Sequence, residues 1–144
     1  MEKPLFKSMM GLFLLAGLIA ACSFGPPKNC GDDIGGTADT TKFDQYFSRM
    51  ALVNAASGES GPEGDSGMQY ASSDLLAIRA DNLADVDVRL CVQNFSTGSI
   101  ASDNTRSFKT GSDSFELGSF EKGTYVMRVI VDGSLVKNFP FEIK

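Results

Sequence analysis

A short run near the middle of the chain alternates strictly between apolar and polar side chains. One set of positions holds Val86, Val88, Leu90 and Val92, and the other holds Asp85, Asp87, Arg89, Cys91 and Gln93. Successive side chains of a β-strand point to opposite faces of its sheet, so this period of two predicts a strand over residues 86–93. One face of that strand is expected to be buried and the other solvated, as is typical of antiparallel sheets.

Further short apolar runs, separated by turn-forming residues, indicate more strands. We expect them at Phe47–Asn54 after a helical turn, at 75–79, near 100, at 108, at 115–117, at 124–131 and at 135–143. Residues 43–53 also fit a helical face, whereas 57–67 and most of 96–105 are expected to be loops because they are rich in turn residues. Since no strongly amphipathic helix accompanies these strands, we predict an all-β fold, a small antiparallel β-sandwich over residues 41–144.

The turn between the last two strands decides which side chains share the core. A two-residue turn would place Leu135 on the face of Ile130. A three-residue loop would place Leu135 and the following phenylalanines on the more apolar face of Met127, so we favour it, with Gly133 or Ser134 in the left-handed conformation. The expected core comprises Val86, Val88, Leu90, Val92, Tyr125, Met127, Val129, Phe139 and Phe141.

The first 21 residues have the layout of a secretory signal. Lys3 and Lys7 form a basic start, and residues 9–21 carry no charge. This apolar run is too short to span a bilayer, which takes about 20 residues, and it suits the central region of a signal peptide. It ends in Ile-Ala-Ala followed by Cys22, which resembles the lipobox of bacterial lipoproteins.

The lipobox resemblance implies removal of residues 1–21 and acylation of Cys22, which becomes the new N-terminus. Several acyl chains on one residue give stable membrane attachment, where a single chain binds only marginally. Ser23, rather than Asp, follows Cys22. In lipoproteins of this kind, that residue implies an outer-membrane location facing the periplasm. An uncleaved anchor, or an ordinary signal peptide cut elsewhere, is the alternative.

Residues 22–40 are rich in Gly, Pro and Asp and poor in apolar side chains, so we expect a flexible tether between lipid and domain. With Cys22 assigned to lipid, Cys30 and Cys91 remain as an even pair in an exported chain. Cys91 lies on the polar face of its strand, and Cys30 lies in a segment without a core. We predict a disulfide between them that fastens the tether to the domain; two free thiols are the alternative.

The segment from residue 115 to 129 resembles the corner between two late strands of immunoglobulin-like and transthyretin-like sandwiches. An apolar strand there leads through a turn into Gly-Thr-Tyr and then into a long inner strand. The resemblance implies that Gly123 is the turn glycine. It also implies that Tyr125 is the corner tyrosine, whose hydroxyl bonds to backbone upstream. It covers roughly residues 74–144 and implies no activity.

The chain contains no histidine and no tryptophan. Without histidine it lacks the usual general base near neutral pH and any Ser-His-Asp, Cys-His or histidine-based zinc site. The nearest carboxylate pairs are Asp85 with Asp87 and Asp32 with Asp33, and a solvated strand face explains the first pair better than catalysis does. We therefore expect no enzyme activity and no cofactor.

Calcium is the one metal worth weighing, because it needs oxygen ligands alone. Two acidic segments offer such ligands: Glu59, Glu63 and Asp65 in one, and Asp81, Asn82 and Asp85 in the other. Neither has the alternating Asp order of a calcium-binding loop. We therefore interpret both as acidic loops and expect no metal site.

Removal of residues 1–21 leaves 123 residues, enough for one domain, with 11 basic and 17 acidic side chains and a net charge of −6. An acidic chain without a basic stripe is a poor candidate for nucleic-acid binding. We expect a non-catalytic, lipid-anchored cell-envelope protein, an accessory or scaffold module that binds another envelope protein. The alternative is a small-ligand or carbohydrate-binding lipoprotein, which the absence of tryptophan disfavours.

Overall fold

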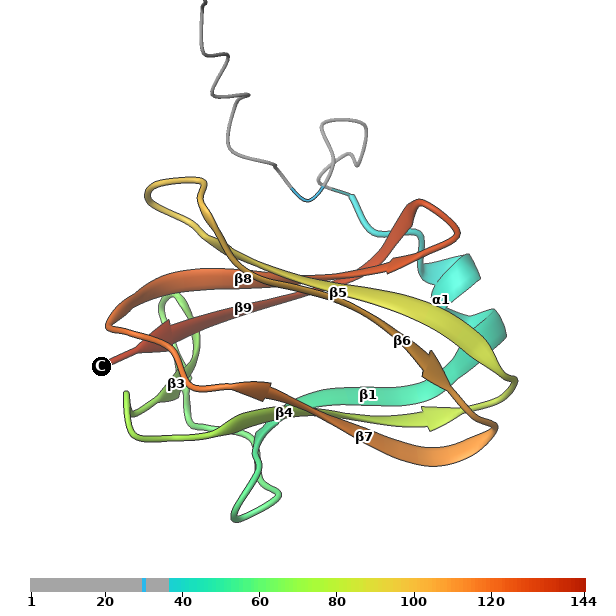
Figure 1. Ribbon diagram of the computed structural model, residues 1–144, viewed down its shortest axis with the longest axis horizontal. Coiled ribbons are helices and arrows are strands. Elements are labelled where there is room, and N and C mark those ends of the chain that lie inside the picture. The colour runs from blue at the N-terminus through green and yellow to red at the C-terminus, as the bar shows by residue number, and fades with distance from the viewer. Residues whose placement is uncertain (1–29, 31–36) are drawn as a thin grey trace, which may run out of the picture.

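The computed structural model describes Cys30 and residues 37–144, which form two β-sheets packed face to face (Figure 1). The helix α1 spans Thr40–Tyr46. The strands are β1 (Phe47–Asn54), β2 (Glu63–Gly64), β3 (Gly67–Tyr70), β4 (Leu76–Asn82), β5 (Val86–Asn94), β6 (Ile100–Phe108), β7 (Gly111–Gly118), β8 (Gly123–Val131) and β9 (Ser134–Ile143). The predicted all-β sandwich is confirmed.

The smaller sheet, sheet A, has the order β1-β4-β7, and the larger one, sheet B, has the order β2-β3-β9-β8-β5-β6. Neighbouring strands run antiparallel except β3, which pairs parallel to β9. The chain crosses between the sheets after β1, β3, β4, β6 and β7. The orders β1-β4-β7 and β9-β8-β5 are the same as the strand orders A-B-E and G-F-C of an immunoglobulin-type sandwich.

The core lies between the two sheets and is built from alternate residues of their strands. In β5, every second residue from Val86 to Val92 is buried, as the alternation predicts. The inner faces of β4 and β8 contribute Ile78 and Met127, which are fully buried. Phe139 is half-buried and packs against this cluster, and the other predicted core residues are buried within it.

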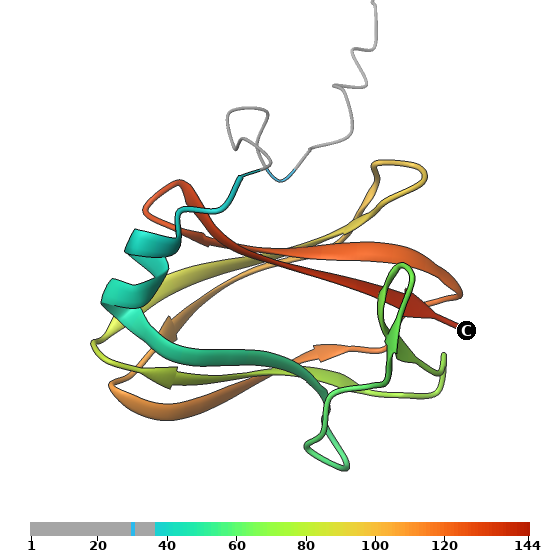
Figure 2. The same ribbon diagram turned by 180° about the vertical axis from the view of Figure 1, so that it is seen from behind.

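The short helix α1 lies at one end of the sandwich, where β1 begins (Figure 2). Asp39 caps it by accepting a 2.9 Å hydrogen bond from the backbone N–H of Lys42. Phe43 and Tyr46 are half-buried against the core, and the Phe43 ring lies 5.2 Å from that of Phe47. The predicted order of a helical turn followed by a strand over Phe47–Asn54 is confirmed.

Strand β6 is longer than the sequence indicates. Residues 96–105 were expected to be mostly loop, yet nine residues from Ile100 to Phe108 form a strand paired with β5. Its inward positions include Ser102, Asn104 and Arg106, opposite Val92, Leu90 and Val88. These positions can be polar because β6 lies at the edge of sheet B, where sheet A, which has only three strands, does not cover it fully. The apolar periodicity that reveals other strands is therefore missing.

Part of the predicted loop over residues 57–67 also forms strands. The two-residue strand β2 pairs with β3, which in turn pairs with β9. Gly67 begins β3 at a φ of 108°, and a Cβ atom there would lie 2.1 Å from the carbonyl oxygen of Pro140. Only glycine permits this close approach. The glycines that suggest a loop are thus what allows β3 to lie beside β9.

The turn between β8 and β9 has two residues, Asp132 and Gly133, so the predicted three-residue loop is wrong. Both adopt positive φ angles, 49° and 72°, as a tight hairpin turn requires, and Gly133 is left-handed as predicted. Leu135 pairs with Ile130 instead of joining the inner face. A bulge at Val136 then shifts the register, so that Phe139 and Phe141 oppose Met127 and Tyr125 as expected.

The predicted signal peptide over residues 1–21 and the predicted lipidation site, Cys22, lie outside the described residues. Within the part of the chain that the structure describes, no helix has the length and apolar composition needed to cross a bilayer.

Candidate functional site

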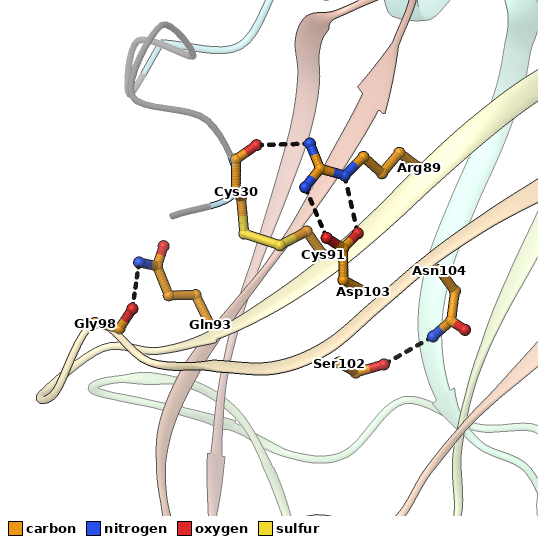
Figure 3. Close-up of a disulfide and its surroundings, with 8 residues drawn as sticks. All are labelled: Cys30, Arg89, Cys91, Gln93, Gly98, Ser102, Asp103 and Asn104. Carbon is orange, nitrogen blue, oxygen red and sulfur yellow. Dashed lines mark hydrogen bonds and ion pairs between the residues drawn. A yellow bond between two sulfur atoms is a disulfide. The ribbon is translucent and has the colours of Figure 1, made fainter. Parts of the chain in front are cut away.

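The predicted disulfide between Cys30 and Cys91 is present on the outer face of sheet B (Figure 3). Its sulfur atoms are 2.05 Å apart and its Cα atoms 5.8 Å apart. Both cysteines are at most 2% exposed and pack with Ile130 and the half-buried Ile100. The bridge therefore forms a small apolar cluster on an otherwise polar face and joins Cys30 covalently to β5, the strand next to the edge strand β6.

Arg89 joins three parts of the chain beside this disulfide (Figure 3). Its Nε and Nη2 atoms donate to the two carboxylate oxygens of Asp103 on β6 at 2.8 and 2.7 Å. Its Nη1 atom donates to the backbone carbonyl of Cys30 at 3.1 Å. The hydrogen bonds to Asp103 raise the pKa of Arg89 above its ordinary value, so the guanidinium remains charged. Sequence reasoning identified Arg89 only as a solvated side chain.

The chain between the disulfide and α1 is also attached to the domain. The backbone N–H of Asp39 donates to the carbonyl of Leu135 on β9 at 2.8 Å. The predicted tether over residues 22–40 thus contacts sheet B at Cys30 and again at Asp39, immediately before α1 begins.

The predicted corner residues Gly123 and Tyr125 lie at the start of β8. The Tyr125 hydroxyl donates to the carbonyl of Glu121 at 2.9 Å, four residues upstream. Its ring centroid lies 5.3 Å from that of Phe141 and 5.6 Å from that of Phe120, inside the core. The corner therefore stabilises the crossing from sheet A to sheet B.

The carboxylates of Asp85 and Asp87 each bind a neighbouring segment. Asp85 accepts hydrogen bonds from the backbone N–H and the hydroxyl of Thr110, at 2.8 and 3.0 Å, and from Lys109 at 3.3 Å. The bonds from Thr110 are the main reason that the pKa of Asp85 lies below its ordinary value. Asp87 accepts from Ser107 across the sheet. Both carboxylates thus hold β5 to the β6–β7 region, and neither is arranged as an acid–base pair.

The acidic segments considered for calcium are likewise not assembled into a site. Asp81 accepts from Ser112 at 2.7 Å and forms an ion pair with Arg49 at 3.4 Å. Asn82 is buried, and its side-chain amide donates to the carbonyl of Lys109. Among residues 37–144 and Cys30, no group of three or more His, Cys, Asp or Glu side chains is placed to hold a metal ion. The other candidate pair, Asp32 and Asp33, lies outside the described residues.

One side of the sandwich consists of two edge strands, β6 from sheet B and β7 from sheet A, and we call it the β6–β7 side. Each strand pairs on one side only, β6 with β5 and β7 with β4. The Arg106 guanidinium of β6 lies 4.3 Å from the ring centroid of Phe115 on β7, so a cation–π contact links the two edges. Along β6, nine consecutive residues have a backbone edge with no neighbouring strand in the described structure.

The opposite side of the sandwich is better covered. On β1, the carbonyl of Leu52 accepts hydrogen bonds from the hydroxyls of Ser60 and Tyr70, both at 2.9 Å. Burial raises the pKa of Tyr70, which keeps its hydroxyl protonated and able to donate. At the far edge of sheet B, β2 is only two residues long. A very short edge strand and an edge carbonyl that already accepts hydrogen bonds, such as that of Leu52, both discourage the addition of another strand. The β6–β7 side is therefore the more open side of the sandwich.

A shallow groove of about 400 Å³ lies at the end of sheet B between the β5–β6 and β2–β3 turns. Phe95 and Ser96 form one wall, Asp65 the other, and Thr124 and Pro140 line the space between them. Phe95 is 74% exposed and is the only exposed aromatic side chain among the described residues. A carbohydrate site normally presents several aromatic or polar groups that converge; one ring here gives that alternative little support.

The chain matches no protein-family model and no curated protein. Six chains of known structure match it. One of these is the beta-D-glucoside glucohydrolase from Trichoderma reesei, with a TM-score of 0.35 and 10% sequence identity. The match covers 68% of this chain and 18% of that enzyme. Function is therefore inferred from the fold and the surface described above.

Proposed function

We propose that this protein is a non-catalytic, lipid-anchored module of the bacterial cell envelope that binds another envelope protein through the edge of β6. Acylated Cys22 holds it to the membrane, facing the periplasm from the outer membrane. The observation that supports the binding mode is the nine-residue edge of β6. An extended segment of a partner can add to such an edge by main-chain hydrogen bonds, with side chains supplying specificity.

The polar side chains of β6 fit binding to one specific protein better than indiscriminate pairing with other strands. Exposed edge strands that are hydrophobic tend to pair indiscriminately, and charged residues reduce that tendency. Asp103 and Arg106 on β6 are both engaged within the domain, one by Arg89 and the other by Phe115. A partner strand must therefore match a fixed pattern of side chains, which favours one partner over many.

A matched pair of lysine variants tests the edge directly. Asn104 points toward the inner face of β6, so an added strand would have to bury the charge of an Asn104→Lys side chain. Ala101 is exposed on the same strand, so Ala101→Lys adds the same charge where it stays in water. We expect affinity-tagged wild type and Ala101→Lys to retain a common partner from detergent-solubilised envelope. Asn104→Lys is expected to lose it.

The same preparation tests the anchor. Cys22→Ala protein should leave the membrane fraction after a salt wash, whereas wild type should stay. Equal recovery of the partner by both lysine variants would place the interface elsewhere on the molecule. An unmodified N-terminus in the mass spectrum of the purified protein would contradict lipid anchoring.

A further inference from the structure

The β5–β6 turn presents a single aromatic ring to solvent in a fixed conformation. The Asn94 side chain accepts hydrogen bonds from the backbone N–H groups of Ser96 and Thr97, both at 3.0 Å. The backbone N–H of Phe95 donates to the carbonyl of Thr124 on β8 at 2.8 Å. The turn is thus well held, and Phe95 remains 74% exposed within it. Residues 94–99 carry no charge.

This turn lies on the same face of the molecule as the disulfide. In Figure 1 it rises from sheet B on the side away from sheet A, which is the face on which Cys91 is bonded to Cys30. Cys91 lies on the outward-facing side of β5, and Phe95 lies in the turn that begins directly after this strand, four residues further along the chain. Four residues at about 3.4 Å each place the two positions at most roughly 14 Å apart. The attachment point of the tether and the exposed ring therefore share one surface, the outer face of sheet B.

The disulfide also limits how far that surface can lie from Cys22. Cys30 lies eight positions after Cys22, and a fully extended chain spans at most about 3.6 Å per residue, or roughly 29 Å. Beyond Cys30, which the bridge and the hydrogen bond from Arg89 hold, the next described attachment is Asp39, whose 17-residue separation from Cys22 allows about 61 Å. The bridge more than halves the reach, and it transfers the attachment from the end of the domain to β5 on the outer face of sheet B.

We propose that the outer face of sheet B faces the lipid bilayer and that Phe95 inserts its ring into the interfacial region. The proposal rests on the proposed lipidation of Cys22. Phe, like Trp and Leu, is typical of segments that bury an apolar surface at the boundary between head groups and acyl chains. An uncharged turn can approach that boundary without desolvating a charge. One ring alone binds a membrane weakly, but the short tether keeps its effective concentration at the surface high.

This orientation leaves the β6–β7 side free for a protein partner, since those edges lie at the flank of the sandwich rather than on the outer face of sheet B (Figure 1). Asp65, on the opposite wall of the Phe95 groove, would disfavour anionic lipids. Zwitterionic phosphatidylcholine is therefore the appropriate probe membrane.

The absence of tryptophan from the chain makes the test direct, because Phe95→Trp creates a single fluorophore of its kind. The lipidated full-length variant is reconstituted into phosphatidylcholine vesicles with and without brominated acyl chains. We expect its emission to shift to shorter wavelength on reconstitution and to lose most of its intensity with brominated lipid. The control is Leu83→Trp in the β4–β5 turn, where Leu83 is 54% exposed, and its emission should be unaffected by bromine.

Two further variants test the role of the bridge. Cys30→Ser/Cys91→Ser in the Phe95→Trp background should float with the vesicles but show much weaker quenching. A variant with 16 Gly and Ser residues inserted after Ser23 keeps the disulfide and lengthens the tether, so it should weaken quenching in the same way without affecting the fold. Unchanged quenching in the insertion variant would overturn the role of tether length.

The possible failures are distinguishable. If the Phe95→Trp protein does not float with the vesicles at all, lipid anchoring itself is wrong. If it floats and is unquenched, or if Leu83→Trp is quenched equally, the proposed orientation is wrong. Quenching that appears only when a protein partner is removed would assign Phe95 to a protein contact instead, and would also overturn the proposal.

Discussion

Leu90 lies at the centre of β5 with none of its surface exposed, and it contributes to the core between the two sheets. Truncation to alanine removes buried methyl groups and leaves a cavity, so Leu90→Ala should lower the free energy of unfolding by about 2–5 kcal/mol. Urea unfolding measures the change. Leu83→Ala serves as the control, because Leu83 is more than half exposed and its loss should change stability by less than about 0.5 kcal/mol. Equal effects of the two substitutions would contradict the assigned faces.

Asp85 should make the free energy of unfolding depend on pH in the acidic range. Its pKa is lower in the folded protein than its ordinary value of 3.8, mainly because the carboxylate accepts hydrogen bonds from Thr110. A lowered folded-state pKa contributes stability above 3.8 that is lost as the pH falls through the folded value. The stability difference between wild type and Asp85→Asn should therefore be constant near neutral pH and shrink below pH 3.8. A difference that persists unchanged in acid would rule out this role.

Single residues differ in how well the sequence predicts their roles. Cys91 could be paired with Cys30 from the sequence, because a thiol on the polar face of an alternating strand needs a partner. Arg89, two residues earlier on the same face, could not be assigned to Asp103, since that contact depends on a strand whose existence the sequence hides. Cys22 lies outside the described residues, so its lipidation stays a prediction.

Strand β3 depends on a glycine, which gives a test of its parallel pairing with β9. In Gly67→Ala the new Cβ would meet the Pro140 carbonyl oxygen at 2.1 Å, in addition to the cost of a positive φ. The control, Gly111→Ala, has a similar φ of 104° but no atom within 4 Å of its Cβ position. We expect Gly111→Ala to lose about 1–3 kcal/mol from backbone strain alone, and Gly67→Ala to lose more.

Hydrogen exchange locates the effect of the glycine substitution. Amides of residues 67–70 should exchange faster in Gly67→Ala, because β3 must move away from β9, whereas Gly111→Ala should leave them protected. Equal stability of the two variants would show that the contact with Pro140 relaxes at little cost.

The strands that the sequence predicts are those with a buried face. Strand β5 is evident from its period of two, and β8 from its apolar run, because both pack between other strands. Strand β6 is not evident, since it lies at an edge where inward positions such as Asn104 need not be apolar. For the β8–β9 hairpin, the prediction that Phe139 shares a face with Met127 is correct, but the predicted cause is wrong. A bulge at Val136, rather than a longer turn, places Phe139 on that face.

The disulfide should contribute substantially to the stability of the whole molecule. It joins residues 61 apart, and the chain-entropy estimate for a loop of that size is roughly 4 kcal/mol. Adding a reductant should therefore shift the urea midpoint of the wild type to a lower concentration by a corresponding amount. The Cys30→Ser/Cys91→Ser variant should unfold at that lower midpoint with or without reductant. A wild-type midpoint that ignores the reductant would show that the bridge adds no stability.

At the same scale, the sequence predicts the sandwich but not its open side. Whether an edge is bare depends on which strands lie next to one another, and that order follows from crossings between sheets rather than from any local pattern. The groove beside Phe95 is also formed by turns that are far apart in the sequence. The surface that carries the proposed contacts therefore forms only in the folded structure and has no local sequence pattern.

The position of the bridge has a mechanical consequence. A pulling force applied to the chain before Cys30 and resisted at the C-terminus passes through the sulfur atoms directly into β5. Residues 31–90 form a closed covalent loop outside that path, so α1 and strands β1 to β4 bear no direct tension. The load is instead carried by the hydrogen-bonded ladders that join β5, β8 and β9. The domain is thus built to resist extension as a sheet under shear, with residues 31–90 protected from unravelling.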